Sequence, residues 1–290
     1  MITGANGFLG RHLVDLMVDR GWTVRGLVRD LERNPFRHPD VALFLGDIPD
    51  VIDERAFENI DVVIHCAYMS RHTTLTEAGR VNEEGSARVL ALSRKHGTRF
   101  AFVSSTGAHE GAVSYYARSK LAVESTLDLD RDLIIRPGLI LGDGGLFKRI
   151  SESLARFGFV PVFDGGHQMI QTVHVGDLSL AIALALERGL TGRYVVAEPE
   201  GLELRDLFAL MGERMGRRLT LVPLPASPLL WVLRCAEHLG VPLPLTSENV
   251  LGAKSLRTQP SAGDLSKIGL SVRGVSESLD GLIAPGRAVR

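Results

Sequence analysis

Tyr116 and Lys120 are the pair of side chains in this sequence best suited to proton transfer. They are four positions apart, so one turn of a helix would carry the phenol and the ammonium on the same face. The lysine charge can then lower the tyrosine pKa from its ordinary value of about 10. Tyr115 does not fit this role, because the residue four positions later is Ser119. The pair therefore indicates acid–base chemistry at a carbonyl or carbinol oxygen.

Hydroxyl side chains stand shortly before this pair. The apolar residues 100–103 predict a strand, and Ser104, Ser105 and Thr106 follow it. A hydroxyl group there can hold a substrate oxygen by hydrogen bonding while the tyrosine exchanges its proton. A tyrosine and a lysine at this spacing are also common on surface helices, so the interpretation depends on a cofactor site elsewhere in the chain.

A glycine-rich loop near the start of the sequence supplies such a site. Gly4, Gly7 and Gly10 lie between a short strand and a helix that we expect to run to about Arg20. This spacing lets the chain turn sharply, brings backbone N–H groups against a pyrophosphate and places the helix N-terminus beside it. Only three residues precede Gly4, fewer than the about five or six of a central strand, so we expect a truncated first strand or a natural start further upstream. The expected dinucleotide contacts come from Gly4, Asn6, Gly7, Phe8, Leu9 and Gly10.

The end of the second predicted strand, 24–28, indicates which dinucleotide binds. An acidic side chain about 20 residues beyond the loop would favour the free ribose 2′-hydroxyl of NAD(H). Here Arg29 comes first and Asp30 second, with Arg33 as a further cation. A guanidinium suits a 2′-phosphate. We therefore favour NADP(H) and keep NAD(H) as the alternative.

Two further predicted strands, 41–45 and 62–65, should also end at the cofactor, since ligands of open α/β sheets lie beyond the carboxyl ends of the strands. Asp47 is a candidate partner for the adenine amino group, and Ile48 follows it as a further lining residue. Cys66 and Ala67 are expected to line the site through their backbone, with the thiol as a small space-filling group.

Strand-like and helix-like stretches alternate along residues 1–137, which predicts an α/β protein with a Rossmann-type doubly wound parallel sheet. From residue 138 the alternation becomes irregular and indicates a smaller C-terminal α+β substrate lobe, 138–290, with segments around 169–197 returning to the sheet. In that lobe His174 lies beside an apolar stretch, where packing is a more common role than catalysis. Asp177 is expected to cap a helix over 178–186.

A strongly apolar helix is predicted at 229–239, between clustered prolines. It is too short to span a bilayer. It could lie on a membrane surface or contact a partner, and we expect it instead to cover the substrate cleft.

Composition excludes several classes of protein. The 33 basic and 34 acidic residues leave a formal charge of −1, and no basic cluster is interleaved with aromatic residues, so nucleic acid is not an expected partner. The two cysteines, Cys66 and Cys235, lack metal-ligand spacing, which predicts no metal site and a reducing compartment, the cytoplasm. No apolar run approaches the about 20 residues of a transmembrane helix.

Taken together, these motifs resemble the extended and atypical branch of the short-chain dehydrogenase/reductase superfamily, the NAD-dependent epimerase/dehydratase family. Beyond the glycine loop, Tyr116 and Lys120, the resemblance rests on Val81-Asn82, on Ile135-Arg136-Pro137-Gly138 and on the run from Thr172 to Asp177. It implies that Ser105 polarises the substrate oxygen, with Ser104 and Thr106 as substitutes. It also implies that Tyr116 is the acid/base, that Lys120 holds the nicotinamide ribose, and that Pro137 lines the cofactor.

One departure from the family concerns the segment between Ser105 and Tyr116, which has only ten residues. Sugar-nucleotide epimerases of the family usually carry a longer segment there. The short form resembles members related to the NAD(P)H-binding accessory subunit of respiratory complex I, in which bound NADP(H) can be largely structural.

We therefore expect an NAD(P)-dependent oxidoreductase acting on a small-molecule carbonyl. A sugar-nucleotide epimerase or dehydratase, and a non-catalytic NADP(H)-binding assembly protein, are the alternatives. A homodimer stays open as the assembly state.

Overall fold

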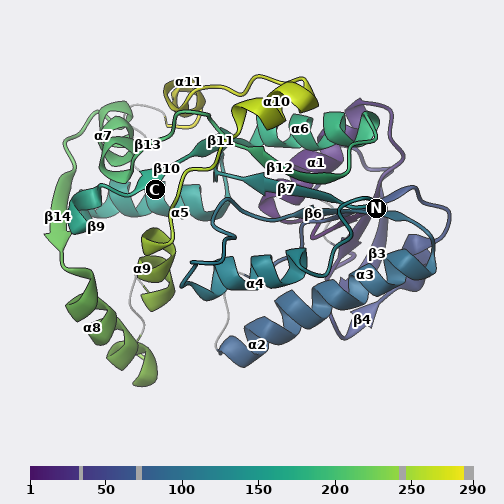
Figure 1. Cartoon of the computed structure of the whole chain (residues 1–290), viewed down its shortest axis with the longest axis horizontal. Helices are drawn as coiled ribbons and strands as arrows, with labels where there is room; N and C mark the ends of the chain where they lie inside the picture. The colour runs from purple at the N-terminus through teal and green to yellow at the C-terminus, as the bar shows by residue number, and fades with distance from the viewer. Residues whose placement is uncertain (33–34, 70–73, 242–245, 284–290) are drawn as a thin grey trace.

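A computed structural model describes residues 1–32, 35–69, 74–241 and 246–283 of the chain (Figure 1). Arg33, considered above as a support for the cofactor phosphate, lies outside these residues.

An eight-stranded sheet forms the centre of the described structure, with the strand order β12-β7-β6-β5-β1-β2-β3-β4. Neighbouring strands are parallel except for β3 and β4, which are antiparallel. This confirms the predicted doubly wound parallel sheet. The strands are β1 (Ile2–Thr3), β2 (Arg25–Val28), β3 (Ala42–Asp47), β4 (Val51–Ile52), β5 (Val62–His65), β6 (Arg99–Val103), β7 (Leu133–Pro137) and β12 (Gly192–Val196).

The strand order reverses at β1, because β2 and β3 continue on one side of it and β5, β6 and β7 on the other. Such a switch point leaves a crevice beyond the carboxyl ends of the central strands, where ligands bind. The first strand is as short as expected, with two residues, yet it pairs on both sides: Ile2 lies opposite Gly26 of β2 and Ile64 of β5.

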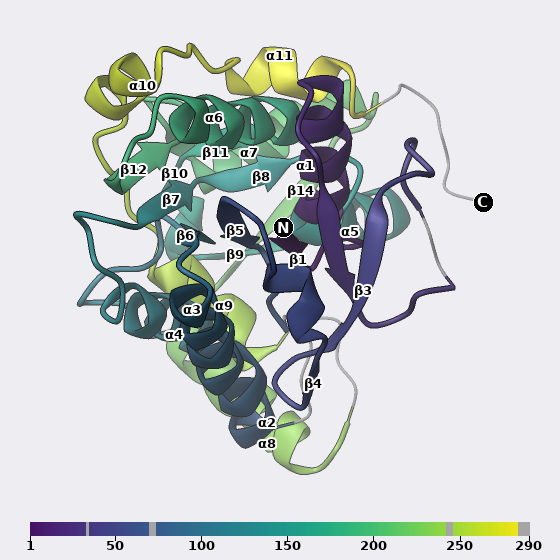
Figure 2. The same ribbon diagram turned by 90° about the vertical axis from the view of Figure 1, so that its right-hand side faces the viewer.

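Helices cover both faces of the sheet (Figure 2). On one face lie α1 (Phe8–Asp19), α6 (Val175–Glu187) and α10 (Ala262–Ile268); on the other lie η1 (Glu54–Phe57), α3 (Gly85–Lys95) and α4 (Tyr115–Glu124). Strand β6 shows how one sequence serves two cores. Its Ala101 and Val103 pack on the α1 side, whereas Phe100 and Phe102 pack on the α3 side, because successive side chains of a strand point to opposite faces.

The helical segment that precedes β6 begins irregularly. α2 (Leu75–Gly79) runs into a π-helical turn, η2 (Arg80–Glu84), and then into α3. The turn carries Asn82, whose side chain is buried. Such turns often occur at functional sites.

The C-terminal lobe has its own small core, in which Phe147, Leu154, Leu207 and Met211 are buried. Short strand pairs connect it: β8 with β11, β9 with β14, and β10 with β13. The boundary at residue 138 stays a prediction. β12 lies in the main sheet, within the segments around 169–197 that were expected to return to it. Helix α10 packs against the same sheet, and the sequence had not indicated this contact. The elements are β8 (Leu139–Leu141), α5 (Gly145–Phe157), β9 (Phe159–Phe163), η3 (Asp164–Gly166), β10 (Met169–Ile170), β11 (Thr172–His174), β13 (Leu202–Glu203), α7 (Leu204–Arg214), β14 (Thr220–Leu224), α8 (Ala226–His238), α9 (Ser247–Lys254) and α11 (Val275–Asp280).

No helix within the described ranges is both long enough and apolar enough to cross a membrane. Nor do three or more His, Cys, Asp or Glu side chains gather into a metal-binding group in that part of the chain.

Candidate active site

Three glycines shape the turn from β1 into α1. Gly4 has a φ of +63°, and a Cβ atom there would lie 2.9 Å from the Ala67 Cα. A Cβ on Gly10 would overlap the Gly4 carbonyl, so both positions require glycine. The helix N-cap is Gly7, which offers no side-chain cap, and the first turn carries no acidic residue. The open N–H groups of this helix end fit an anionic pyrophosphate.

The Phe8 ring, predicted to contact the cofactor, packs against a second loop. Cβ atoms on Gly142 and Gly145 would lie 2.6 and 2.9 Å from ring atoms of Phe8, and one on Gly144 would overlap the ring. The ring therefore explains the glycine run before α5, a relationship that the sequence did not reveal. Of the other predicted loop residues, Leu9 packs against the sheet core and Asn6 is half-buried in the turn.

A buried hydrogen-bond chain fixes the end of β5 beside the glycine loop. The Thr3 hydroxyl lies 2.8 Å from His65 Nδ1 and accepts a hydrogen bond from the Ala67 N–H, while His65 Nε2 lies 2.9 Å from the Ser86 hydroxyl. Burial, together with the charge of Lys120, lowers the pKa of His65 to about 3. The imidazole is thus a neutral packing group. Burial raises the pKa of the Cys66 thiol to about 12, which agrees with a space-filling role.

Tyr68 is a site residue that sequence reasoning missed. Met69, the residue after Tyr68, is held by the side chain of Asn82. The Asn82 amide accepts a 2.7 Å hydrogen bond from the Met69 N–H and donates a 3.1 Å hydrogen bond to the Met69 carbonyl. Tyr68 then shares a 3.0 Å hydrogen bond with the Ser119 hydroxyl, and its ring stands perpendicular to that of Tyr116 at 5.1 Å. Its position three residues after the end of the predicted strand 62–65 was the available signal.

Ser105 and Tyr116 interact at the carboxyl edge of the sheet. The Ser105 hydroxyl accepts a 3.1 Å hydrogen bond from the Gly107 N–H and is also hydrogen-bonded to the Tyr116 side chain, which partly offsets the effect of burial on the tyrosine pKa. Tyr116 is 42% exposed as a residue. Desolvation is nevertheless the larger influence and raises its pKa above the ordinary value.

Lys120 lies one turn further along α4 and is 5% exposed. Its Nζ donates a 2.7 Å hydrogen bond to the Val103 carbonyl and lies 4.6 and 4.7 Å from the ring centres of Tyr68 and Phe102. Burial lowers the pKa of Lys120 to about 8. The expected lowering of the Tyr116 pKa by this lysine is therefore wrong, because desolvation raises the tyrosine pKa and outweighs the hydrogen bond from Ser105.

Ser104 belongs to a buried ion-pair network and does not face the candidate active site. Its hydroxyl donates to the Glu124 carboxylate, which also accepts hydrogen bonds of 2.8 and 2.7 Å from the Arg136 guanidinium. Thr106 is buried as well, and its N–H donates to the Pro137 carbonyl at 2.9 Å. Of the three hydroxyl residues, Ser105 is thus the one left facing Tyr116.

The lobe clamps the loop that carries Ser105. Glu248, in α9, accepts a 2.8 Å hydrogen bond from the Tyr115 N–H at the start of α4. Ser255 accepts a 3.1 Å hydrogen bond from the Val113 N–H, and Gln259 donates to the Thr106 carbonyl. Helix α9 was not predicted, so this clamp became visible only in the structure.

The remaining predicted cofactor residues lie where parallel strands end. Arg29 is exposed directly after β2, and Asp47 is exposed at the end of β3. Ile48 turns toward α3, since a Cβ on Gly85 would lie 2.5 Å from its side chain. Arg29 and Asp47 therefore share the edge of the sheet at which α1 begins.

Asp177 does not cap its helix as expected. Helix α6 begins earlier, at Val175, and the cap is His174, whose Nδ1 accepts a 3.0 Å hydrogen bond from the Gly176 N–H. Asp177 instead pairs with Arg273 at 2.7 Å. His174 thus has a structural contact at the start of α6, which agrees with the expectation of a packing role rather than a catalytic one.

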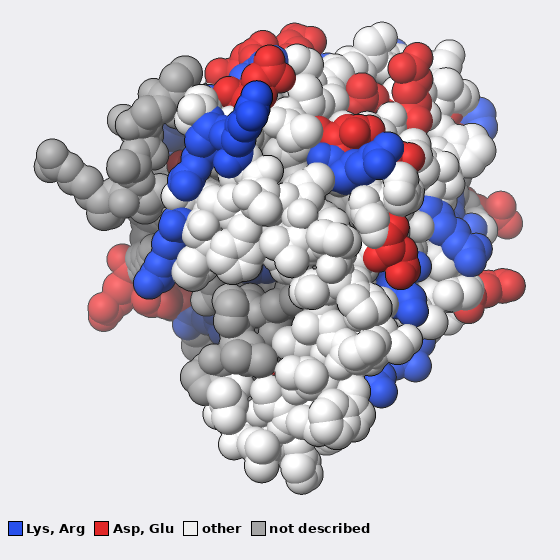
Figure 3. All heavy atoms as spheres, turned by 90° about the vertical axis from the view of Figure 1, so that its left-hand side faces the viewer, with Lys and Arg blue, Asp and Glu red and all other residues white. Residues whose placement is uncertain are grey.

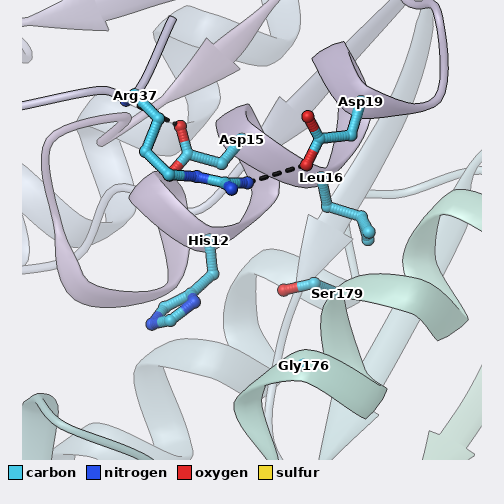
Figure 4. Close-up of a pocket in the computed structure, with 7 residues that line it drawn as sticks. All are labelled: His12, Asp15, Leu16, Asp19, Arg37, Gly176 and Ser179. Atoms are coloured by element: carbon cyan, nitrogen blue, oxygen red, sulfur yellow. Dashed lines mark hydrogen bonds and ion pairs between the residues drawn. The ribbon is translucent and has the colours of Figure 1, made fainter.

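A hollow of about 420 Å³ lies between α1, α6 and Arg37 (Figure 4). Arg37 bridges Asp15 and Asp19 at its rim, at 3.2 and 2.7 Å, so both carboxylates are already ion-paired. Its lining is His12, Asp15, Leu16, Asp19, Arg37, Gly176 and Ser179, and it includes none of the three predicted catalytic residues.

Two features decide the class of protein. The bare N-terminus of α1 lies at the switch point of a doubly wound sheet. Ser105, Tyr116 and Lys120 lie at the carboxyl edge of neighbouring strands, where Ser105 bonds Tyr116 and Lys120 bonds the end of β6. This is the architecture of the extended short-chain dehydrogenases/reductases.

Comparison with known proteins makes the assignment specific. The model of the NAD dependent epimerase/dehydratase family matches residues 1–197, and the chain belongs to this family. It is 33% identical over 236 residues to a ceramide reductase of Caulobacter vibrioides, covering 77% of this chain and 73% of that one. It is 27% identical over 270 residues to the mitochondrial NADH dehydrogenase [ubiquinone] 1 alpha subcomplex subunit 9 of Arabidopsis thaliana, covering 86% and 66% of the two chains. The fold also matches the crystal structure of gox2253 with a TM-score of 0.75 at 22% identity, over 96% of this chain and 94% of that one.

Proposed function

We propose that this protein is an NADP(H)-dependent oxidoreductase that reduces a ketone on a long, apolar substrate. The observation that carries the proposal is the contact between Ser105 and Tyr116 at the carboxyl edge of the sheet, next to the dinucleotide cradle. The 33% identity to a ceramide reductase supports a lipid-like substrate. Arg29 at the end of β2 supports NADP(H) over NAD(H).

The nicotinamide, when bound, supplies the hydride. Ser105 donates a hydrogen bond to the ketone oxygen, and Tyr116 transfers its proton to that oxygen as the carbon is reduced. Because desolvation raises the Tyr116 pKa, the phenol carries its proton at neutral pH, which is the form that reduction needs. Lys120, one helical turn away, favours the phenolate left behind until solvent returns the proton.

The decisive experiment removes one hydroxyl. Tyr116→Phe should lower NADPH-dependent reduction of a long-chain ketone in detergent micelles about 10²- to 10⁴-fold, with NADPH affinity nearly unchanged. Tyr115→Phe is the matched control, since it loses the same hydroxyl from the adjacent residue. Unaltered turnover in Tyr116→Phe, or loss confined to Tyr115→Phe, would refute the assignment of Tyr116.

A non-catalytic role is the second candidate, favoured by the 27% identity to the complex I subunit over 86% of the chain. In that case NADPH would co-purify in a stable complex with a partner, and no ketone would oxidise it. A sugar-nucleotide epimerase would instead interconvert its substrate without net NADPH consumption. The segment between Ser105 and Tyr116 is shorter than in sugar-nucleotide epimerases of the family, which favours a reductase over an epimerase.

A further inference from the structure

Helix α8 turns its largest apolar side chains toward solvent. Trp231 is 70% exposed, Leu239, its C-cap residue, 75%, Val232 50% and the following Val241 48%. We call these four residues the α8 face. On the inner side of the helix, Ala226 and Leu233 are buried against Val250 of α9. The helix is therefore apolar on both sides, although only one of them is covered within the described protein.

Helical geometry places three residues of the α8 face on one stripe. At about 100° per residue, Trp231, Leu239 and Val232 fall within about 100° of one another around the axis. Leu233 lies roughly opposite to them. A solvent-facing stripe with a tryptophan is typical of helices that lie in the interfacial region of a membrane.

The chain segment that leads through β14 into α8 has a positive net charge. Residues 216–241 contain the basic residues Arg217, Arg218 and Arg234 and a single acidic one, Glu237, although the whole chain is balanced at −1. Glu237 is exposed but engaged with α9, because its carboxylate accepts hydrogen bonds of 2.6 and 2.7 Å from the Ser247 N–H and hydroxyl. Figure 3 shows this side of the molecule as a broad uncharged area with basic side chains, and some acidic ones, along parts of its border. An anionic surface complements such a face.

We propose that the α8 face docks the protein onto an anionic phospholipid bilayer. This revises our expectation that the helix covers the substrate cleft, because its most exposed apolar residues point away from the rest of the protein. For the catalytic consequence the inference rests on the proposed function: a reductase of lipid-like ketones would take its substrate from the bilayer.

A short structural path links the α8 face to the candidate active site. Glu237 of α8 binds Ser247, the first residue of α9, and the next residue, Glu248, holds the Tyr115 N–H at the start of α4. Tyr116 follows directly. A helix that rests on the membrane surface is thus connected through α9 to the element that carries the proposed proton donor.

Vesicle binding tests the proposal without any need for turnover. Trp22 and Trp231 are the two tryptophans of the chain, so Trp22→Phe leaves Trp231 as a single fluorescent reporter on the α8 face. With vesicles of phosphatidylcholine containing phosphatidylglycerol, we expect the full-length protein to cosediment and the Trp231 emission to shift to the blue. Pure phosphatidylcholine and added salt should both weaken binding, because they remove the electrostatic attraction.

Substitution on the α8 face should have a selective effect. Trp231→Ala combined with Leu239→Ala should lower the vesicle association constant about tenfold or more. The matched control is Leu45→Ala with Val51→Ala, which truncates exposed apolar residues at the far edge of the sheet and should leave binding unchanged.

The outcomes separate docking from catalysis. The docking proposal fails if the protein does not bind anionic vesicles, if both variant pairs bind alike, or if the α8 face instead holds a concentration-dependent dimer that Trp231→Ala dissociates. Ketone reduction in micelles without vesicle binding would overturn docking alone. Vesicle binding without any ketone reduction would leave docking in place and overturn the proposed function.

Discussion

The Ser104 hydroxyl donates a hydrogen bond to the buried carboxylate of Glu124, twenty residues later in the chain. The same carboxylate pairs with Arg136, so Ser104 belongs to an ion-pair network beneath the sheet edge. Its neighbour Ser105 extends to the opposite side and meets Tyr116. Two adjacent serines thus serve two different parts of the protein.

Alanine substitution of each serine should distinguish a role in stability from a role in catalysis. Ser104→Ala removes a donor from a buried carboxylate and should lower the free energy of unfolding by about 1–3 kcal/mol, with activity retained in the folded fraction. Ser105→Ala should change stability by less than about 0.5 kcal/mol and reduce kcat about 10²-fold. Urea unfolding and ketone reduction measure the two effects. The opposite pattern would assign the catalytic hydroxyl to Ser104.

Lys120 should make stability depend on pH. Burial lowers its folded pKa to about 8, below the unfolded value of about 10.4, so between these values the unfolded chain binds more protons than the folded one. The free energy of unfolding should therefore rise with pH across this window. Below pH 8 the buried lysine is charged, and its full desolvation penalty lowers the free energy of unfolding. The difference in unfolding free energy between wild type and Lys120→Met should change by on the order of 3 kcal/mol from about pH 7 to 10.5.

Urea unfolding of the two proteins at several pH values gives that difference. Lys254→Met is the control, because Lys254 is an exposed lysine of α9. Parallel stability curves for wild type and Lys120→Met would show that the buried ammonium does not titrate in this window.

Arg29 should set the cofactor preference. If its guanidinium contacts the 2′-phosphate, wild type binds NADPH more tightly than NADH, and Arg29→Ala loses about ten- to hundredfold in NADPH affinity while NADH affinity stays nearly constant. Arg29→Lys keeps the charge but not the planar fork, and should fall between the two. Fluorescence titration with both dinucleotides measures this. Equal wild-type affinities would remove the argument from Arg29.

The sheet and much of the site followed from local patterns. Alternation of apolar strands and helices predicted the parallel order, since connections of this kind are almost always right-handed crossovers. The four-residue spacing of Tyr116 and Lys120 predicted a shared helix face, and both lie in α4. Gly4, Gly7 and Gly10 predicted the cradle at α1, because only glycine tolerates its close backbone contacts.

Partners distant in the sequence decided the rest. Tyr68 and Phe102, from two other strand ends, surround the Lys120 ammonium and remove it from water, so the direction of its pKa shift could not be inferred from its spacing to Tyr116. Asn82 fixes Tyr68 through Met69, thirteen residues away.

The sequence by itself determined which residue types lie on which strand end or helix, because periodicity and short-range spacing are properties of the backbone geometry. Only the tertiary structure decided that Ser105 rather than Ser104 faces Tyr116, and that Trp231 faces solvent rather than the cleft. Desolvation and hydrogen-bond competition depend on groups that folding brings together from distant parts of the chain, and no local pattern contains them.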